Sequence, residues 1–164
     1  MAGILDARPK VGYFYTGKTK FSFISEKIRD IKVSEVKSVP VVVDESTSIY
    51  DSIVLMFLED VGSIFVTSDG FLSGVVSRKD FIKSALGGVD LNKMPIGMIM
   101  TRMPNVIYIK EDDDILEAAV KLIDHEIDSL PVVEEDNDGK GYKVIGRVTK
   151  TTITRLFVEL GKED

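Results

Sequence analysis

Residues 74–80 read Gly-Val-Val-Ser-Arg-Lys-Asp, and residues 146–152 repeat the pattern as Gly-Arg-Val-Thr-Lys-Thr-Thr. The repetition extends outward from these two stretches, because residues 39–86 as a whole recur as residues 105–160. A duplicated unit that cannot bury its own apolar faces must pack against its twin. The sequence therefore predicts two similar modules related by a pseudo-twofold axis, and the clefts at such an interface are natural ligand sites.

An apolar stripe at helical spacing marks the first helix of each copy. The stripe consists of Ile49, Ile53 and Met56, and it recurs 66 positions later as Ile115, Ala119 and Leu122. The spacing has grown to 72 at Gly74 and Gly146, and the six extra residues fall in the run 134–141, which is rich in charged and turn-forming residues. The insertion therefore lengthens a loop and leaves the duplicated fold intact.

Each copy predicts the same order of elements: a strand, a helix, two strands and a closing helix. The strands are expected at 39–43, 63–67 and 72–76, and again at 105–109, 129–133 and 143–148. The first helices follow polar caps at 46–48 and 112–114, and the closing helices end at Gly87 and Gly161. The expected fold class is α+β, with two tandem β-α-β-β-α modules packed as a pseudo-twofold pair.

The chain ahead of the first copy matches neither repeat. Residues 1–25 are expected to form an arm or linker, followed by one module over 26–92 and another over 93–164. Residues 1–32 carry seven basic and three acidic side chains, a balance of +4, which leaves −10 for the rest of a chain whose net charge is −6. An acidic body would repel a phosphate backbone, so the repeats are not expected to hold nucleic acid. The basic arm either faces a polyanion or an acidic partner, or is a solvated tail.

A brief helix is expected at 25–33, with Ile28 and Ile31 turned inward, and it corresponds to residues 94–99 ahead of the second copy.

The composition excludes several classes of function. The 164 residues are 44% apolar, with no run near the ~20 residues that span a bilayer and no secretory signal, so a globular protein of the cytoplasm is expected, with no membrane partner. There is no cysteine and His125 is the only histidine, so no catalytic constellation or metal site can be assembled, and we expect no enzyme.

The start of each closing helix is the sharpest functional signal. Ser77 would cap a helix whose free amides and positive dipole end suit a phosphate, and the preceding Gly74 permits close approach of a ligand or of another backbone. Asp80, one turn on, either accepts hydrogen bonds from ribose hydroxyls or closes a capping box with Ser77 that needs no ligand. The second copy has Thr152 at the position of Asp80, so its cleft is expected to bind a ribose more weakly.

Two other motifs match known ligand-binding patterns, but their surrounding residues do not fit those functions. Residues 12–19 satisfy the phosphate-loop pattern GxxxxGK[ST], but no apolar strand precedes them and bulky aromatic residues occupy the loop, so we interpret the match as coincidence. The acidic run 134–138 resembles a calcium loop, but Ile145 stands where a bidentate glutamate would close it, so a solvated turn is expected.

Both repeats resemble CBS modules over residues 30–160, and the stretch 74–80 is similar to the ribose-phosphate motif of that family. The resemblance implies a pair of modules that binds adenosine ligands such as AMP, ADP or ATP in its clefts, often as a homodimer formed through helices. Carried over, the first cleft would use Pro40, Val41, Gly62, Ile64, Ser77, Arg78 and Asp80. The second cleft would use Val106, Ile107, Asp128, Leu130, Thr149, Lys150 and Thr152.

Residues 6–18, followed by a pair that contains Val76-Ser77-Arg78-Lys79-Asp80, also resemble the effector half of CcpN-type transcriptional repressors. Members of that family bind DNA through an N-terminal winged helix-turn-helix, which this sequence does not contain. We therefore expect an adenine-nucleotide-sensing, dimerising regulatory pair of a repressor, with DNA contact only through that missing domain. The alternative is a stand-alone subunit that binds adenosine ligands and regulates an enzyme or a transporter.

Overall fold

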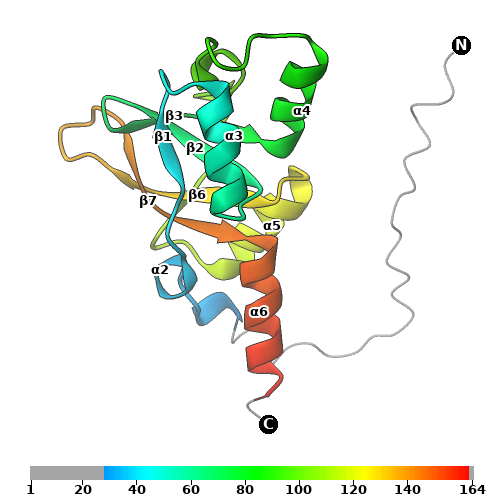
Figure 1. Ribbon diagram of the computed structural model, residues 1–164. Coiled ribbons are helices and arrows are strands. Elements are labelled where there is room, and N and C mark those ends of the chain that lie inside the picture. The colour runs from blue at the N-terminus through cyan, green and yellow to red at the C-terminus, as the bar shows by residue number, and fades with distance from the viewer. Residues whose placement is uncertain (1–27, 163–164) are drawn as a thin grey trace, which may run out of the picture.

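A computed structural model describes residues 28–162, and Figure 1 shows its two modules with their sheets and helices. The first module contains β1 (Val42–Asp44), α3 (Ile49–Leu58), β2 (Ser63–Ser68), β3 (Phe71–Ser77) and α4 (Arg78–Leu86). The second contains β5 (Ile109–Lys110), α5 (Ile115–Asp124), β6 (Ser129–Glu135), β7 (Tyr142–Thr149) and α6 (Lys150–Leu160). The leading and linking segments add α2 (Val33–Val36), the 3₁₀ turn η1 (Ile96–Met98) and β4 (Thr101–Arg102).

Both modules have the predicted topology. In the first, β1 pairs with β2 in parallel and β2 pairs with β3 antiparallel, and the second repeats this order with β5, β6 and β7. The parallel pair needs the crossover helix α3 or α5, whose N-caps are Ser48 and Asp114 as the sequence predicts. The α+β class and the β-α-β-β-α order are therefore confirmed.

The first strand of each module is shorter than predicted. The sequence predicts 39–43 and 105–109, whereas the strands occupy Val42–Asp44 and Ile109–Lys110. The reason is that the chain crosses between modules just before each strand. Ser38 exchanges backbone hydrogen bonds of 2.9 Å with Arg147 of the second module, and only three residues later the carbonyl of Val41 accepts from Phe65 in the first.

Leading segments are exchanged between the modules. The segment ahead of the first module packs on the second, where Val33 N donates to Asp113 O at 3.0 Å and Val33 is buried in the core. The linker in turn serves the first module, because Ile96 is buried there and its N donates to Thr47 O at 2.7 Å. Figure 1 shows α2 at the same end of the molecule as α6.

The helix expected at 25–33 differs over its described part. Residues 28–30 form a helical turn, and α2 begins only at Val33. Ile31 interrupts the helix because its carbonyl accepts a hydrogen bond of 2.9 Å from the backbone N–H of Ile115. Ile28 and Ile31 nevertheless pack against the second core, so their inward orientation is confirmed. The phosphate-loop match at 12–19 lies outside the described residues.

Three apolar clusters stabilise the described structure. Two are the cores of the individual modules. The third lies between them, with Phe65 and Leu72 of the first module buried against Val106 and Val133 of the second. Burial of apolar area at this junction is the main force that fixes the pseudo-twofold arrangement. Within residues 28–162, no helix has the length and apolar character to cross a membrane.

Candidate functional site

The two glycines of the repeated motif, Gly74 and Gly146, lie in close contact with other segments of the protein. A Cβ on Gly74 would touch the side chain of Met100 and lie 2.8 Å from the Thr101 carbonyl oxygen, and a Cβ on Gly146 would lie 2.9 Å from Lys37 Cδ. The sequence left open whether a ligand or another backbone makes the close approach. In the structure the exchanged segments make this close approach, and they run along the outer edges of β3 and β7.

Each closing helix begins with a reciprocal pair of polar side chains. The carboxylate Oδ2 of Asp80 accepts from Ser77 N at 2.9 Å and from Ser77 Oγ at 2.6 Å. In the second module Thr149 N donates to Thr152 Oγ1 at 3.2 Å, and Thr152 N donates to Thr149 Oγ1 at 3.1 Å. The capping-box alternative therefore holds at both helix starts. A ribose-binding role for Asp80 stays a prediction, and only its Oδ1 is left to accept a hydrogen bond from a ribose hydroxyl.

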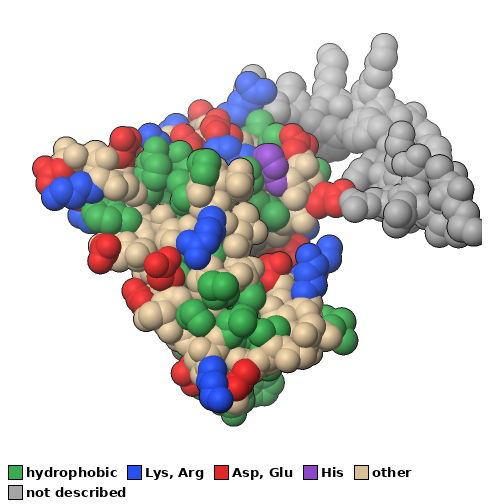
Figure 2. All heavy atoms as spheres, turned by 90° about the horizontal axis from the view of Figure 1, so that it is seen from above, with side chains coloured by type: hydrophobic (Ala, Val, Ile, Leu, Met, Phe, Trp, Pro, Cys, Tyr) green, Lys and Arg blue, Asp and Glu red, His purple; other side chains and the backbone are tan. Residues whose placement is uncertain are grey.

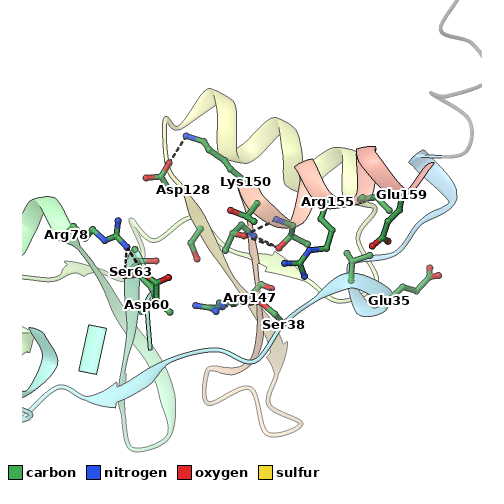
Figure 3. A pocket seen from close by; sticks show the side chains of 18 residues that line it. Glu35, Ser38, Asp60, Ser63, Arg78, Asp128, Arg147, Lys150, Arg155 and Glu159 are labelled. Carbon is green, nitrogen blue, oxygen red and sulfur yellow. Dashed lines mark hydrogen bonds and ion pairs between the residues drawn. The ribbon is translucent and has the colours of Figure 1, made fainter. Parts of the chain in front are cut away.

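A cavity of about 750 Å³ lies between the modules at the start of α6 (Figure 3). Figure 3 shows Asp60, Ser63 and Arg78 of the first module on one side and Arg155 and Glu159 of α6 on the other. Three parts of the chain line it. They are Glu35, Val36 and Ser38 of the exchanged segment, residues 60–63 with Arg78, and module-2 residues Asp128, Ser129, Arg147, Thr149, Lys150, Thr151, Thr152, Arg155, Leu156 and Glu159.

Four cationic side chains line this cleft, and they differ in the hydrogen bonds and ion pairs that they already make. Lys150 Nζ is paired with Asp128 Oδ1 at 2.8 Å, and Arg147 Nε donates to Ser38 Oγ at 3.2 Å. Arg78 donates to the Val61 carbonyl at 3.2 Å. Arg155 has no hydrogen bond or ion pair within the described part of the chain. Together with the positive end of the α6 helix dipole, these groups make a site for an anion.

Ser63 provides an independent indication of a ligand. Its Oγ is buried at the cleft wall and has no hydrogen-bond partner among residues 28–162. A buried hydroxyl without a partner loses about 1–3 kcal/mol of hydrogen bonding with water. A ligand oxygen or nitrogen in the cleft would restore that bond.

The structure sorts the fourteen predicted site residues into three groups. Six of them line the cleft: Gly62, Arg78, Asp128, Thr149, Lys150 and Thr152. Ser77 and Asp80 contact each other at the start of α4 and lie outside that cleft. The others are part of the strands and cores, with the side chains of Ile64, Val106 and Leu130 buried and those of Pro40, Val41 and Ile107 partly buried.

Sequence reasoning missed several lining residues. Arg155 and Glu159 continue the stripe that begins at Thr149 and Thr152, so helical periodicity would have found them. Glu35, Ser38 and Ser63 carry no such signal, because the exchanged segment and the opposite module bring them to the cleft.

A second cavity, of about 690 Å³, lies between α3 and α4 and is mostly apolar. Its apolar lining residues are Ile53, Met56, Phe57, Phe81, Ile82 and Ala85. We call it the α3–α4 groove. Asp60 and Arg78 line both the groove and the cleft, so these two residues lie between the two cavities.

Comparisons with known proteins agree with this architecture. The sequence profile of the CBS domain matches residues 28–87 and 96–159. The transcriptional repressor CcpN of Bacillus subtilis (strain 168) is 46% identical over 165 residues, which covers 100% of this chain and 77% of that protein.

Two solved structures with adenosine compounds are also similar. The CBS domain pair of protein MJ0100 in complex with 5′-methylthioadenosine and S-adenosyl-L-methionine has a TM-score of 0.66 and 28% identity, and the match covers 78% of this chain and 96% of that one. CBSX2 in complex with AMP has a TM-score of 0.66 and 27% identity, and the match covers 80% of this chain and 98% of that one.

Proposed function

This chain belongs to the CBS domain family as a tandem pair, and on that premise we propose that it senses adenine nucleotides as the effector-binding, dimerising part of a transcriptional repressor. The observation that carries the proposal is the cleft at the start of α6, where the positive end of the helix dipole and several cations surround a cavity of about 750 Å³. Its relation to CcpN supports the repressor role. The solved pairs with S-adenosyl-L-methionine and with AMP support an adenosine ligand.

In this proposal the nucleotide phosphates lie at the N-terminus of α6. Thr149 and Lys150 are there, and Arg155, whose side chain has no partner within residues 28–162, can turn toward the anion. Hydrogen bonds to charged groups contribute about 1.5–3 kcal/mol each, so a few such contacts account for micromolar to millimolar affinity. Thr152 and Asp128 are positioned to accept from ribose hydroxyls. The function is binding and signalling, not catalysis.

A first site at the start of α4 belongs to the same proposal. It would use Ser77 and Arg78 toward the phosphate and the free Oδ1 of Asp80 toward the ribose, beside the strand residues Pro40, Val41 and Ile64. In the second site, Val106, Ile107 and Leu130 take the corresponding strand positions. Because four cationic side chains line the cleft at α6, we expect a phosphate to bind there first, and we still expect Thr152 to hold a ribose more weakly than Asp80.

Isothermal titration calorimetry of the full chain with AMP, ADP and ATP tests the proposal. We expect saturable heat with at least one nucleotide and a tenfold or greater loss of affinity in the double variant Thr149→Ala, Lys150→Gln. Inorganic phosphate is the control for binding of the anion alone. Absence of any heat of binding at millimolar nucleotide would refute the sensor function.

Self-association through helices is part of the proposal. Several apolar side chains on the outer faces of the helices are exposed: Val54, Phe57, Ile82 and Leu86 in the first module, and Val120, Ile123, Phe157 and Val158 in the second. Figure 2 shows hydrophobic side chains reaching one face of the molecule in patches between charged ones. Exposed apolar patches of this kind mark association surfaces. We propose that a second copy of the chain covers these helices in a homodimer.

The proposed homodimer would set the spacing of two DNA-binding domains. A nucleotide can alter that spacing only by binding two arrangements of the pair with different affinity. DNA would be held by a winged helix-turn-helix outside this sequence, and the site of action would be the cytoplasm.

A stand-alone regulatory subunit is the second candidate. It is favoured by the match to CBSX2, because this chain covers 98% of the crystallised CBSX2 chain. That crystallised chain therefore consists almost entirely of the matched pair. Reading the genomic frame upstream of Met1 discriminates between the two functions. A reading frame that extends into a helix-turn-helix domain favours the repressor, and a frame that begins at Met1 favours the subunit.

A further inference from the structure

Arg78 lies at the boundary between the nucleotide cleft and the α3–α4 groove. It is the first residue of α4, and its side chain lines both cavities. Asp60 is the other residue that both cavities share. Whatever Arg78 contacts therefore changes the surface of two sites at once.

The present contacts of Arg78 are weak. Its Nη2 donates to the Val61 carbonyl at 3.2 Å and lies 4.0 Å from Asp60 Oδ1. The Arg78 side chain is 64% exposed and that of Asp60 is fully exposed, so water competes for both groups. A phosphate in the cleft would offer Arg78 a bidentate partner of higher charge.

Asp60 is attached directly to the wall of the groove. It lies in the turn that ends α3, with a φ of +47° in the left-handed region. Its N donates to Phe57 O at 3.3 Å, and the next residue's N donates to Met56 O at 3.1 Å. Phe57 and Met56 both line the groove, so the contact between Asp60 and Arg78 joins the end of α3 to the start of α4.

We propose that Arg78 is a two-position side chain that couples the cleft to the groove. In the free protein it contacts Asp60 across the end of the groove. When an adenine nucleotide occupies the cleft, Arg78 turns to the phosphates and leaves Asp60, so the groove opens at that end. This inference rests on the proposed nucleotide function and adds that Asp60 competes with the nucleotide for Arg78.

A double-mutant cycle measured by calorimetry with AMP tests the competition. We expect Asp60→Asn to raise AMP affinity three- to tenfold when Arg78 is present and less than twofold in the Arg78→Gln background. Glu159→Gln removes the same charge from the far side of the cleft, and its effect should be equal in both backgrounds. Equal gains from Asp60→Asn in both backgrounds would show that only general electrostatics acts, and the proposal would be wrong.

A tryptophan reporter tests the second half of the coupling. The chain contains no tryptophan, so Phe57→Trp places a single tryptophan at the groove, and excitation at ~295 nm separates its emission from that of the tyrosines. At AMP concentrations that calorimetry shows to be saturating, its emission maximum should shift when Arg78 is present and stay constant in Arg78→Gln. If AMP binds and the emission stays constant in both backgrounds, the coupling fails while the nucleotide function stands. If AMP, ADP and ATP all fail to bind, the function itself fails.

Discussion

The carboxylate oxygen Oδ2 of Asp80 accepts two hydrogen bonds from Ser77, one from its backbone N at 2.9 Å and one from its Oγ at 2.6 Å. The start of α4 is therefore satisfied by the protein alone. The equivalent pair at α6 is made of two hydroxyls, Thr149 and Thr152, which carry no charge and line an open cleft. The repeated motif thus caps the closing helix of both modules, and in the second module it also forms a cleft wall.

Asp80→Ala is expected to lower the free energy of unfolding by about 1 kcal/mol, because a capping residue is lost. AMP affinity of the cleft at α6 should stay within twofold of wild type, since Asp80 does not line it. Urea denaturation and calorimetry measure the two effects. Thr152→Ala is the matched variant and should reduce both. A large loss of AMP affinity with unchanged stability in Asp80→Ala would instead place a ribose on this carboxylate.

Arg155→Gln is expected to weaken AMP binding about three- to tenfold and to reduce its dependence on salt. Arg155 lines the cleft without a partner in the described part of the chain, so its charge is available to a phosphate. Lys79→Gln removes the same charge from α4 outside the cleft and should change the affinity less than twofold. Calorimetric titrations at two salt concentrations provide the comparison, and equal effects of both variants would exclude a direct contact.

Gly74→Ala is expected to destabilise the first module by about 1–3 kcal/mol. The new methyl group would collide with Met100 and with the backbone carbonyl of Thr101, which is 2.8 Å from the ideal Cβ position, and overpacking of this kind has such a cost. Gly62→Ala is the control, because a Cβ there meets nothing within 4 Å. Thermal unfolding measures the difference, and equal stability of the two variants would contradict the close approach.

The hairpin between β6 and β7 should make stability depend on pH. Lys143 Nζ lies 2.8 Å from Asp136 Oδ1, and this hydrogen bond lowers the pKa of Asp136 and raises the pKa of Lys143. The carboxylate contribution is present above the unfolded Asp pKa of about 3.9 and is lost as pH falls through the lower folded value. The lysine contribution is present below its unfolded pKa of about 10.4 and is lost as pH rises through the higher folded value.

Asp136→Asn should therefore be less stable than wild type between about pH 5 and pH 9, and the difference should shrink at both extremes. Urea denaturation from pH 2 to pH 11 measures it. Asp112→Asn, an exposed carboxylate outside the hairpin, is the control and should follow wild type. A difference that is constant down to pH 2 would show that the ion pair does not stabilise the hairpin.

Phe57→Ser and Phe157→Ser are each expected to weaken self-association about tenfold or more. These side chains are 82% and 64% exposed on the helices, so a partner's helices could bury them at a gain of about 1.5–3 kcal/mol each. Val39→Ser removes an equally exposed side chain, 83%, from the crossover between modules and should leave the dimer unchanged. Sedimentation equilibrium gives the dissociation constants, and three equal constants would place the interface elsewhere.

Local sequence patterns are enough to predict the duplication, the order of elements, the helix caps and the residues at the start of α6. These features depend on neighbours three or four positions apart, such as Ser48 with Asp51 or Thr149 with Thr152, and helical or strand periodicity reveals such contacts directly. Six of the fourteen predicted site residues line the cleft for the same reason.

Long-range contacts set which module each leading segment packs against. Ser38 meets Arg147 across 109 positions of sequence, and no local pattern encodes that pairing. The exchange brings Glu35 and Ser38 to the cleft and places Lys37 and Met100 against the two glycines. The structure also shows that Asp80 caps α4, whereas its contact with a ribose stays a prediction, because a cap depends on a three-residue spacing and a ligand contact does not. Contacts between distant segments are fixed by burial of complementary surfaces, which a linear pattern does not contain.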